Sequence, residues 1–279
     1  MSKVKILVDG SCDLSKEMLE KYDIGVVGMN VSFDEESYIA GVEIDNETFY
    51  TKMRQMKELP KTACPSPDRF IEAYKCEGDV LLITLTSKLS GTYSCAKLAK
   101  DMYDDDFGDK KIEVIDSLSG CIGHGLLAIK AGELALEGKT IEEIVEEIES
   151  IKQDIVFYGA LETLENAIKG GRINPIAGKI INTLNFKAVI KINDGIVKPI
   201  DKARGTNNSL KKVLDYVYKD LDNTENKILA IGHANCSEKA QKIKEAISSN
   251  YSFKDIIISE VGPTMGTYTS EGAILIAYI

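Results

Sequence analysis

Short apolar runs alternate with helix-patterned segments along most of the 279 residues. The runs at residues 5–8, 80–85 and 112–115 have the length of buried strands, and each leads through a polar loop into a segment with helical spacing. This order is typical of a mostly parallel sheet whose two faces are covered by helices. The alternation therefore predicts an α/β fold.

A second series of strands and helices begins near residue 155. It opens with a predicted strand at residues 155–160, continues with a helical segment at 177–184, and contains a hairpin across the Asn-Asp-Gly sequence at 193–195. The chain is longer than one typical domain. We therefore predict two α/β domains with mostly parallel sheets, residues 1–155 and residues 156–279, which share a large interface because no low-complexity linker separates them.

The charge and the N-terminus exclude several classes of protein. A formal net charge of −10 argues against wrapping nucleic acid or an anionic membrane, since either needs a basic face. No apolar run approaches the ~20 residues of a membrane span. The first residues lead straight into a strand without a signal-peptide pattern. We expect a cytoplasmic protein without membrane insertion.

The cysteines and histidines predict neither disulfides nor a metal site. The six cysteines are scattered without a Cys-x-x-Cys pair, which in a large chain lacking export signals is typical of reduced thiols. The two histidines, His124 and His233, lack ligand-type spacing to a cysteine pair. A phosphate-binding Gly-x-x-x-x-Gly-Lys-Ser/Thr loop is also absent. We predict no cofactor.

The strand at residues 80–85 breaks into the sequence Thr-Ser-Lys-Leu-Ser-Gly-Thr-Tyr at 86–93 and then enters a helix. Hydroxyls and free backbone N–H groups meet there at the positive end of the helix dipole, which suits a carboxylate or a phosphate. Gly91 lacks a Cβ and would let a ligand approach the backbone. Alternatively, Ser90 merely caps the helix.

Polar loops follow several predicted strands, where ligands bind in open α/β sheets. Most of these loops are rich in Ser and Thr and contain no His, which favours a hydroxyl-lined cradle over an acid–base site. Asp9 and Asp116 each end a strand; without a phosphate cradle, we interpret them as carboxylates that order their loops rather than as a magnesium pair. The candidate loops are residues 9–13, 62–66, 87–92, 116–119 and 262–272.

Seven short motifs occur in a fixed order and give the chain a family resemblance. Together they resemble the DegV family, bacterial fatty-acid-binding proteins that include the lipid-carrying subunit of fatty acid kinase. The likeness covers essentially the whole chain. The motifs are Asp-Gly-Ser-Cys-Asp-Leu at 9–14, Pro-Lys-Thr-Ala-Cys-Pro-Ser-Pro at 60–67, Leu-Ser-Gly-Thr-Tyr at 89–93, Ile-Asp-Ser at 115–117, Lys-Gly-Gly-Arg-Ile at 169–173, Asp-Gly at 194–195 and Val-Gly-Pro…Gly-Thr at 261–267.

The resemblance implies a non-enzymatic protein that holds one long-chain fatty acid, such as palmitate, in a tunnel between two domains, with a role in lipid transport or fatty acid metabolism. The family's head-group contacts fall on Thr62 and Ser90, with Gly91 and Thr92 in support. Tyr268 stands where the family often has a histidine. Its hydroxyl can still donate a hydrogen bond, but a cationic partner for the head group is missing.

The resemblance also implies a partner. In kinase systems of the family, a separate kinase subunit phosphorylates the bound acid, and Arg172 and Arg204 match arginines used for the docked kinase. Their alternative role is solvated surface charge. Glu271, placed near the head group, would disfavour a second negative charge. These departures keep lipid binding but weaken the expectation of kinase coupling.

A small-molecule phosphotransfer or hydrolytic enzyme using the same cleft is the alternative. A serine hydrolase would use Ser90 as nucleophile and His124 or His233 as base. Lys88 occupies the position of the first glycine of a Gly-x-Ser-x-Gly elbow, so that motif is absent. We therefore favour non-catalytic lipid binding.

Overall fold

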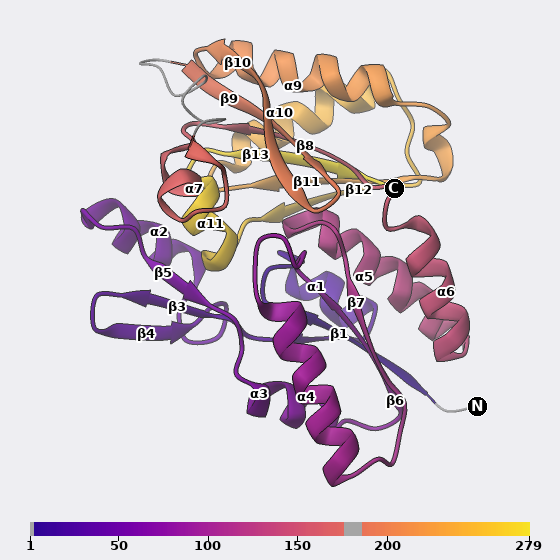
Figure 1. The fold of residues 1–279 in the computed structure, drawn as a ribbon. Coiled ribbons are helices and arrows are strands. Elements are labelled where there is room, and N and C mark those ends of the chain that lie inside the picture. The colour runs from indigo at the N-terminus through magenta and orange to yellow at the C-terminus, as the bar shows by residue number, and fades with distance from the viewer. Residues whose placement is uncertain (1–2, 176–185) are drawn as a thin grey trace.

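The computed structural model describes residues 3–175 and 186–279, which form three sheets with helices around them (Figure 1). The first sheet has the order β2-β1-β6-β7, and all its pairs are parallel, as predicted for this part of the chain. Its strands are β1 (Val4–Asp9), β2 (Ile24–Val27), β6 (Asp79–Thr84) and β7 (Ile112–Asp116).

The second sheet has the order β10-β9-β8-β13-β11-β12. Only the β11–β12 pair is parallel, so the prediction of a mostly parallel sheet is wrong for this half. A two-residue turn joins β9 to β10 and forces them antiparallel, and β13 inserts antiparallel between β8 and β11. The strands are β8 (Val156–Leu161), β9 (Phe186–Asn193), β10 (Ile196–Arg204), β11 (Ile228–His233), β12 (Asp255–Glu260) and β13 (Ile274–Tyr278).

A small antiparallel sheet, β4-β3-β5, adjoins the first. The sequence at residues 24–33 indicates one long strand, but the chain breaks after β2 and continues as β3 in this separate sheet. The three-residue strand β5 falls where a loop was predicted; it is too short to show a period, and its pairing with β3 fixes Thr62 opposite Val31. The strands are β3 (Asn30–Phe33), β4 (Glu36–Ile39) and β5 (Lys61–Ala63).

Helices cover the sheets as the apolar periodicity predicts. Two helix starts are capped by side chains that are typical of this position: Asp45 accepts the backbone N–H of Thr48, and Thr140 and Glu143 make a capping box. The second sheet carries α9 and α10 on its outer face (Figure 1). The helices are α1 (Lys16–Lys21), α2 (Asn46–Gln55), α3 (Pro67–Tyr74), α4 (Thr92–Asp106), α5 (Cys121–Leu136), α6 (Ile141–Ile151), α9 (Thr206–Asp220) and α10 (Ser237–Ser248).

Helix α5 packs between the two large sheets. It contacts β1 and β6 on one side and β11 and β13 on the other. Its glycines allow this close approach: a Cβ on Gly125 would lie 2.8 Å from the carbonyl oxygen of Cys12. One hydrophobic core therefore includes strands of both sheets. The predicted domain boundary between residues 155 and 156 stays a prediction.

Two short helices, α7 (Glu165–Lys169) and α11 (Pro263–Thr269), pack against each other. The sequence predicted a polar loop at 262–272 because the Thr- and Gly-rich segment has low helix propensity. Tertiary contacts hold α11 instead: the Tyr50 hydroxyl donates to the carbonyl oxygen of Val261, just before the helix. The helix predicted at 177–184 lies outside the described residues.

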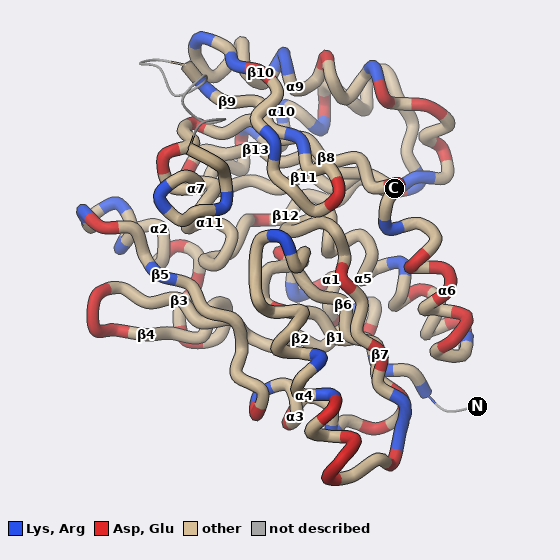
Figure 2. Tube along the Cα trace, viewed as in Figure 1, with Lys and Arg blue, Asp and Glu red and all other residues tan. Residues whose placement is uncertain are grey.

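Charged side chains lie mainly on the outer elements. Figure 2 shows Lys and Arg interspersed with Asp and Glu along α2, α4, α6 and α9, whereas β8, β11 and β13 carry none of these residues. Within the two described ranges, no helix has the length and apolar character needed to cross a membrane.

Candidate functional site

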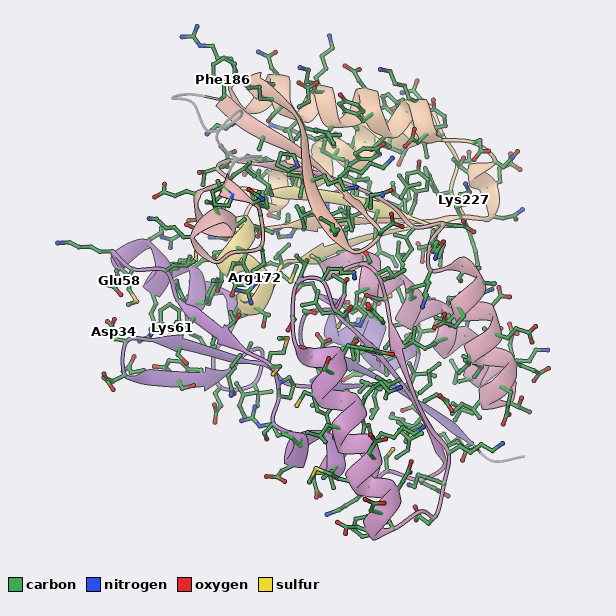
Figure 3. The ribbon with its side chains drawn as sticks, in the orientation of Figure 1. Asp34, Glu58, Lys61, Arg172, Phe186 and Lys227 are labelled. Atoms are coloured by element: carbon green, nitrogen blue, oxygen red, sulfur yellow. The ribbon has the colours of Figure 1, made fainter. Side chains whose placement is uncertain are left out.

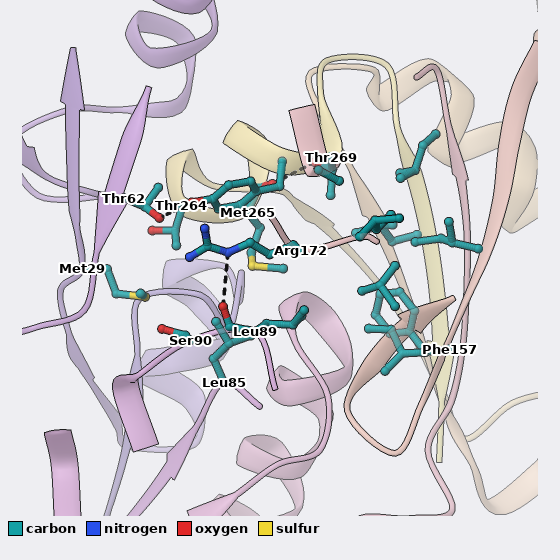
Figure 4. Close-up of a pocket in the computed structure, with 18 residues that line it drawn as sticks. Met29, Thr62, Leu85, Leu89, Ser90, Phe157, Arg172, Thr264, Met265 and Thr269 are labelled. Atoms are coloured by element: carbon teal, nitrogen blue, oxygen red, sulfur yellow. Dashed lines mark hydrogen bonds between the residues drawn. The ribbon is translucent and has the colours of Figure 1, made fainter. Parts of the chain in front are cut away.

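A cavity opens between the second sheet, α11 and the loop before α4 (Figure 4). It holds about 690 Å³ of space free of protein atoms, its opening included. Twelve of its eighteen lining residues are apolar, so most of the interior offers no hydrogen bonds. The apolar residues are Met29, Leu85, Leu89, Phe157, Leu161, Ala167, Ile173, Ile190, Ile192, Val197, Met265 and Leu275.

Alternate residues of the second sheet build the apolar wall. Phe157 and Leu161 face the cavity, whereas Tyr158 and Ala160 belong to the core beneath α9 and α10. This follows from the two-residue period of a strand. Strands β9, β10 and β13 contribute further aliphatic side chains to the same wall.

Polar groups gather at the opposite end of the cavity. Thr62 from β5 and Tyr268 from α11 are joined by a hydrogen bond of 2.7 Å between their hydroxyl oxygens. Figure 4 shows Thr62 beside Thr264, with Arg172 between them and Leu89, and Phe157 at the far end. The cavity therefore has one apolar and one polar end, which suits an amphiphile.

The loop before α4 places Ser90 at the polar end. Its hydroxyl lies 2.8 Å from the hydroxyl of Thr92 and accepts the backbone N–H of that residue at 3.3 Å. Thr92 is fully buried and Gly91 is the exposed N-cap of α4, and neither lines the cavity. The structure thus brings the predicted residues Thr62, Ser90 and Tyr268 together, while Thr92 orients Ser90 from behind.

Arg172 also lines the polar end, although the sequence assigned it to a partner interface. Its Nε donates to the carbonyl oxygen of Leu89 (3.2 Å), and its Nη1 donates to that of Gly170 (2.6 Å). The guanidinium carbon lies 4.6 Å from the centroid of the Tyr268 ring. Figure 3 shows Arg172 next to α11. A cationic side chain therefore lines the polar end of the cavity, whereas the replacement of histidine by Tyr268 had suggested that a cation would be missing.

Among the described residues, no carboxylate lies within ion-pair distance of Arg172. The guanidinium is half-buried, and its fork of donors matches a carboxylate. Arg204, at the end of β10, is exposed and does not line the cavity. The two arginines that the sequence grouped therefore have different surroundings, and only Arg172 can act on a cavity ligand.

Sequence reasoning missed Thr264, the second residue of α11. It is 2% exposed and lines the cavity, and its hydroxyl has no hydrogen-bond partner within the described part of the chain. A buried hydroxyl without a partner costs about 1–3 kcal/mol. Such a group at the polar end of a cavity points to a ligand that completes its hydrogen bonds. The Gly-Pro helix start just before Thr264 was the available signal.

Glu271, which the resemblance placed near the head group, lies outside the cavity. Its carboxylate pairs with Arg54 at 2.6 Å and accepts a hydrogen bond from the side-chain amide of Asn235 at 2.7 Å. It does not line the cavity. The negative charge of Glu271 is thus balanced within its own surroundings.

Asp9 and Asp116 order the loops around the site, as interpreted from the sequence. Asp9 accepts the backbone N–H groups of Ser11 (3.0 Å) and Leu85 (2.6 Å). Asp116 accepts those of Ser87 (3.2 Å) and Leu118 (3.1 Å). Across residues 3–175 and 186–279, no cluster of His, Cys, Asp and Glu side chains could hold a metal ion.

Asp13 holds the start of α11, and thereby Thr264 and Tyr268. Its Oδ1 accepts the backbone N–H of Gly262 at 2.8 Å, and its backbone carbonyl accepts a hydrogen bond from the Ser259 hydroxyl. The second carboxylate oxygen has no partner among the described residues. Burial raises the pKa of Asp13 to about 7.

This pKa predicts a pH dependence of stability that Asp13→Asn should remove. The ordinary pKa of the group is 3.8, so between about pH 4 and pH 7 the folded state keeps a proton that the unfolded state has lost. The free energy of unfolding should therefore fall by about 1.4 kcal/mol per pH unit over this window, roughly 4 kcal/mol in all, and level off above it. Urea unfolding at several pH values measures the slope.

The Asn side chain can keep the hydrogen bond from Gly262. Between about pH 4 and pH 7, the free energy of unfolding of the variant should fall with pH less steeply than that of wild type, by about 1.4 kcal/mol per pH unit. Asp34→Asn, at an exposed position, is the matched control and should keep the wild-type slope. Identical slopes for Asp13→Asn and wild type would contradict the raised pKa.

Neither histidine pairs with Ser90. The Nε2 atom of His124 lies 2.8 Å from the carbonyl oxygen of Ile83, in the core. His233 accepts the backbone N–H of Cys236 at Nδ1 (3.3 Å), and burial lowers its pKa. Neither residue lines the cavity. The serine–histidine pair that a hydrolase would need is therefore not formed.

Comparison with known proteins agrees with these features. The sequence model of a family described as uncharacterised protein, DegV family COG1307, matches residues 3–279. A DegV domain-containing protein of Clostridium acetobutylicum is 34% identical over 279 residues, which cover 99% of this chain and 97% of the relative.

Two solved structures share the fold over nearly the whole chain. A protein from Eubacterium ventriosum, described as a fat acid (stearic acid)-binding protein, has a TM-score of 0.92 and 29% identity and covers 100% of this chain and 98% of its own. The Streptococcus pneumoniae Fatty Acid Kinase (Fak) B3 protein, loaded with linoleic acid, has a TM-score of 0.88 and 28% identity and covers 100% and 99%.

Proposed function

The chain belongs to the DegV family, and from this membership and the lining of its cavity we propose that it binds one long-chain fatty acid, such as palmitate. The observation that carries the proposal is the division of the cavity into an apolar end and a polar end. The acyl tail lies along the second sheet. The carboxylate lies among the hydroxyls and the guanidinium at the other end.

Each polar residue has a distinct role toward the carboxylate. Arg172 neutralises the negative charge of the bound carboxylate, because among the described residues no protein carboxylate already pairs with its guanidinium. Thr264 donates a hydrogen bond to the carboxylate, since its hydroxyl has no partner among the described residues. Thr62 and Ser90 fix the orientation, with Tyr268 holding Thr62 from the side. Thr92 acts through Ser90, and Gly91 gives no direct contact.

The free energies of binding expected for the acyl tail and for the carboxylate head group differ. Burying the fourteen methylenes of palmitate at ~0.8 kcal/mol each yields roughly 11 kcal/mol, before the cost of association. Each hydrogen bond to the charged head adds about 1.5–3 kcal/mol. The tail therefore sets affinity, and the head group sets orientation and the preference for acids over alcohols.

Thr264→Val should stabilise the empty protein and weaken the bound acid. The variant removes a buried hydroxyl without a partner at nearly constant shape, so the free energy of unfolding should rise by about 1 kcal/mol. Loss of a charged hydrogen bond should weaken palmitate by roughly tenfold or more. Urea unfolding of lipid-free protein and titration calorimetry measure the two effects.

Thr269→Val is the control for stability, because the Thr269 hydroxyl already donates to the carbonyl oxygen of Met265 at 3.1 Å. It should gain no stability. A Thr264→Val variant that is less stable and binds palmitate as before would show that this hydroxyl has a structural role only.

Native mass spectrometry of freshly purified protein tests the function itself. We expect a bound mass of a C16–C18 acid, released when the protein is denatured. Lipid-free protein that is stabilised against heat by nucleotides, but not by fatty acids, would instead favour the phosphotransfer alternative.

We further infer that the bound acid is presented to a kinase subunit. The likeness to a fatty acid kinase B3 protein supports this role, as does the exposed Arg204, which is available to a partner. Glu271, paired with Arg54, places no repulsive charge at the head group. Acyl-phosphate formation on mixing loaded protein with a fatty acid kinase subunit tests the inference; its absence would limit the role to binding and transport.

A further inference from the structure

A second pocket lies behind the apolar end of the acyl cavity. It is formed by the turn between β9 and β10, the loop between β7 and α5, and the segment that joins α6 to β8. Phe157 and Ile192 line both cavities. These two residues therefore lie between the two spaces, and we refer to them as the end wall.

The two sides of the end wall differ in chemistry. The acyl side is aliphatic, whereas the second pocket is lined by charged residues of both signs, including Lys152, Asp154 and Asp194. Ser119 also lines it, and its buried hydroxyl finds no hydrogen-bond partner among the residues described. An acyl chain that passed the end wall would displace polar contacts rather than gain apolar ones.

The register of the strands explains why Phe157 and Ile192 lie side by side. The antiparallel pairing of Tyr158 with Lys191 brings the preceding residue of β8, Phe157, opposite Ile192, and Ile192 pairs with Val197 on β10. These three side chains form a row across the sheet. In the next row on the cavity side, Gly159 has no side chain, and the side chains of Leu275 and Ile190 close over its backbone, where a Cβ would lie 2.8 Å from Cδ2 of Leu275.

The ring of Phe157 is also backed by α5. A Cβ on Gly123 would lie only 2.9 Å from Cδ2 of Phe157, so the helix backbone already touches the ring. Phe157 is 2% exposed. The ring cannot move toward α5 to make room for a longer chain.

We propose that Phe157 and Ile192 end the acyl cavity and set the longest fatty acid that the protein binds. The proposal rests on the proposed function and adds a specificity determinant to it. Below the limit, each further methylene should raise affinity by about fourfold. Beyond the limit, the gain stops, because the extra carbons meet the end wall and the polar pocket behind it.

A series of saturated acids from twelve to twenty carbons, titrated into lipid-free wild type and Phe157→Ala, tests this proposal. Wild type should show a chain length at which the fourfold steps stop. In Phe157→Ala, that length should increase by about two carbons, because the chain can occupy the space of the removed ring before it meets the polar pocket. Acids shorter than the wild-type limit should lose affinity slightly.

Leu161→Ala is the matched control, since Leu161 lines the acyl cavity from the same strand as Phe157 but does not line the second pocket. It should weaken all acids by a similar factor and leave the limit unchanged. Phe157→Leu, a smaller change, should shift the limit in the same direction. If thermal unfolding shows that Phe157→Ala does not fold, Phe157→Leu replaces it in this experiment. The same limit in wild type and in the folded Phe157 variants would overturn the proposal, whereas failure of every acid to bind wild type would overturn the proposed function.

Discussion

Shortening the bound acid from sixteen to twelve carbons is expected to weaken binding by roughly 200-fold, since four methylenes contribute about 0.8 kcal/mol each. The reason is the continuous apolar wall that strands β8, β9, β10 and β13 build from alternate residues. Titration calorimetry with lipid-free protein measures the two affinities.

The same loss should appear between the alcohols of sixteen and twelve carbons, because the dependence belongs to the tail. A difference of less than tenfold between the two acids would mean that the tail is not buried along the sheet. The apolar wall would then be ordinary core, and the cavity would not be an acyl site.

Replacing Arg172 by methionine is expected to weaken palmitate by roughly 10- to 100-fold while changing the affinity for hexadecanol by less than threefold. A charge-assisted hydrogen bond contributes about 1.5–3 kcal/mol, and the alcohol has no charge to lose. Methionine keeps an apolar stem against the Tyr268 ring, where the guanidinium now lies. Calorimetry with both ligands separates the two contributions.

Arg204→Met is the matched control for this experiment. It removes the same charge from an exposed position outside the cavity and should leave both affinities unchanged. Equal losses of acid and alcohol in Arg172→Met would indicate that Arg172 acts by holding the Leu89 and Gly170 carbonyls in place. A comparable loss in Arg204→Met would indicate a general effect of net charge.

The sequence predicted those elements whose signals are local. Apolar runs identified β1, β6 and β7, and the Asp-Gly turn at 194–195 identified the β9–β10 hairpin. Strand direction in the second sheet depends on where β13 inserts, which is a property of the whole fold. The short elements β5 and α11 were missed because pairing with β3 and the contact from Tyr50 hold them, rather than their own propensity.

Some residues of the candidate site could likewise be predicted from local sequence signals, and others could not. Ser90 and Thr62 could be found from strand ends and motif order, and the structure places both in one cavity. Arg172 and Thr264 could not be assigned from the sequence. In the part of the chain that the structure describes, Arg172 has no carboxylate within ion-pair distance and the Thr264 hydroxyl has no hydrogen-bond partner, and these two properties distinguish them. Whether a guanidinium or a hydroxyl has a partner is decided only when distant segments of the chain pack together.

A crystal structure of the protein incubated with palmitate tests the central claim most directly. We expect the carboxylate within hydrogen-bond distance of Arg172 and of Thr62, Ser90 or Thr264, and the terminal methyl against Phe157. A carboxylate at the Phe157 end, or an acid bound outside the cavity lined by these residues, would contradict the claim.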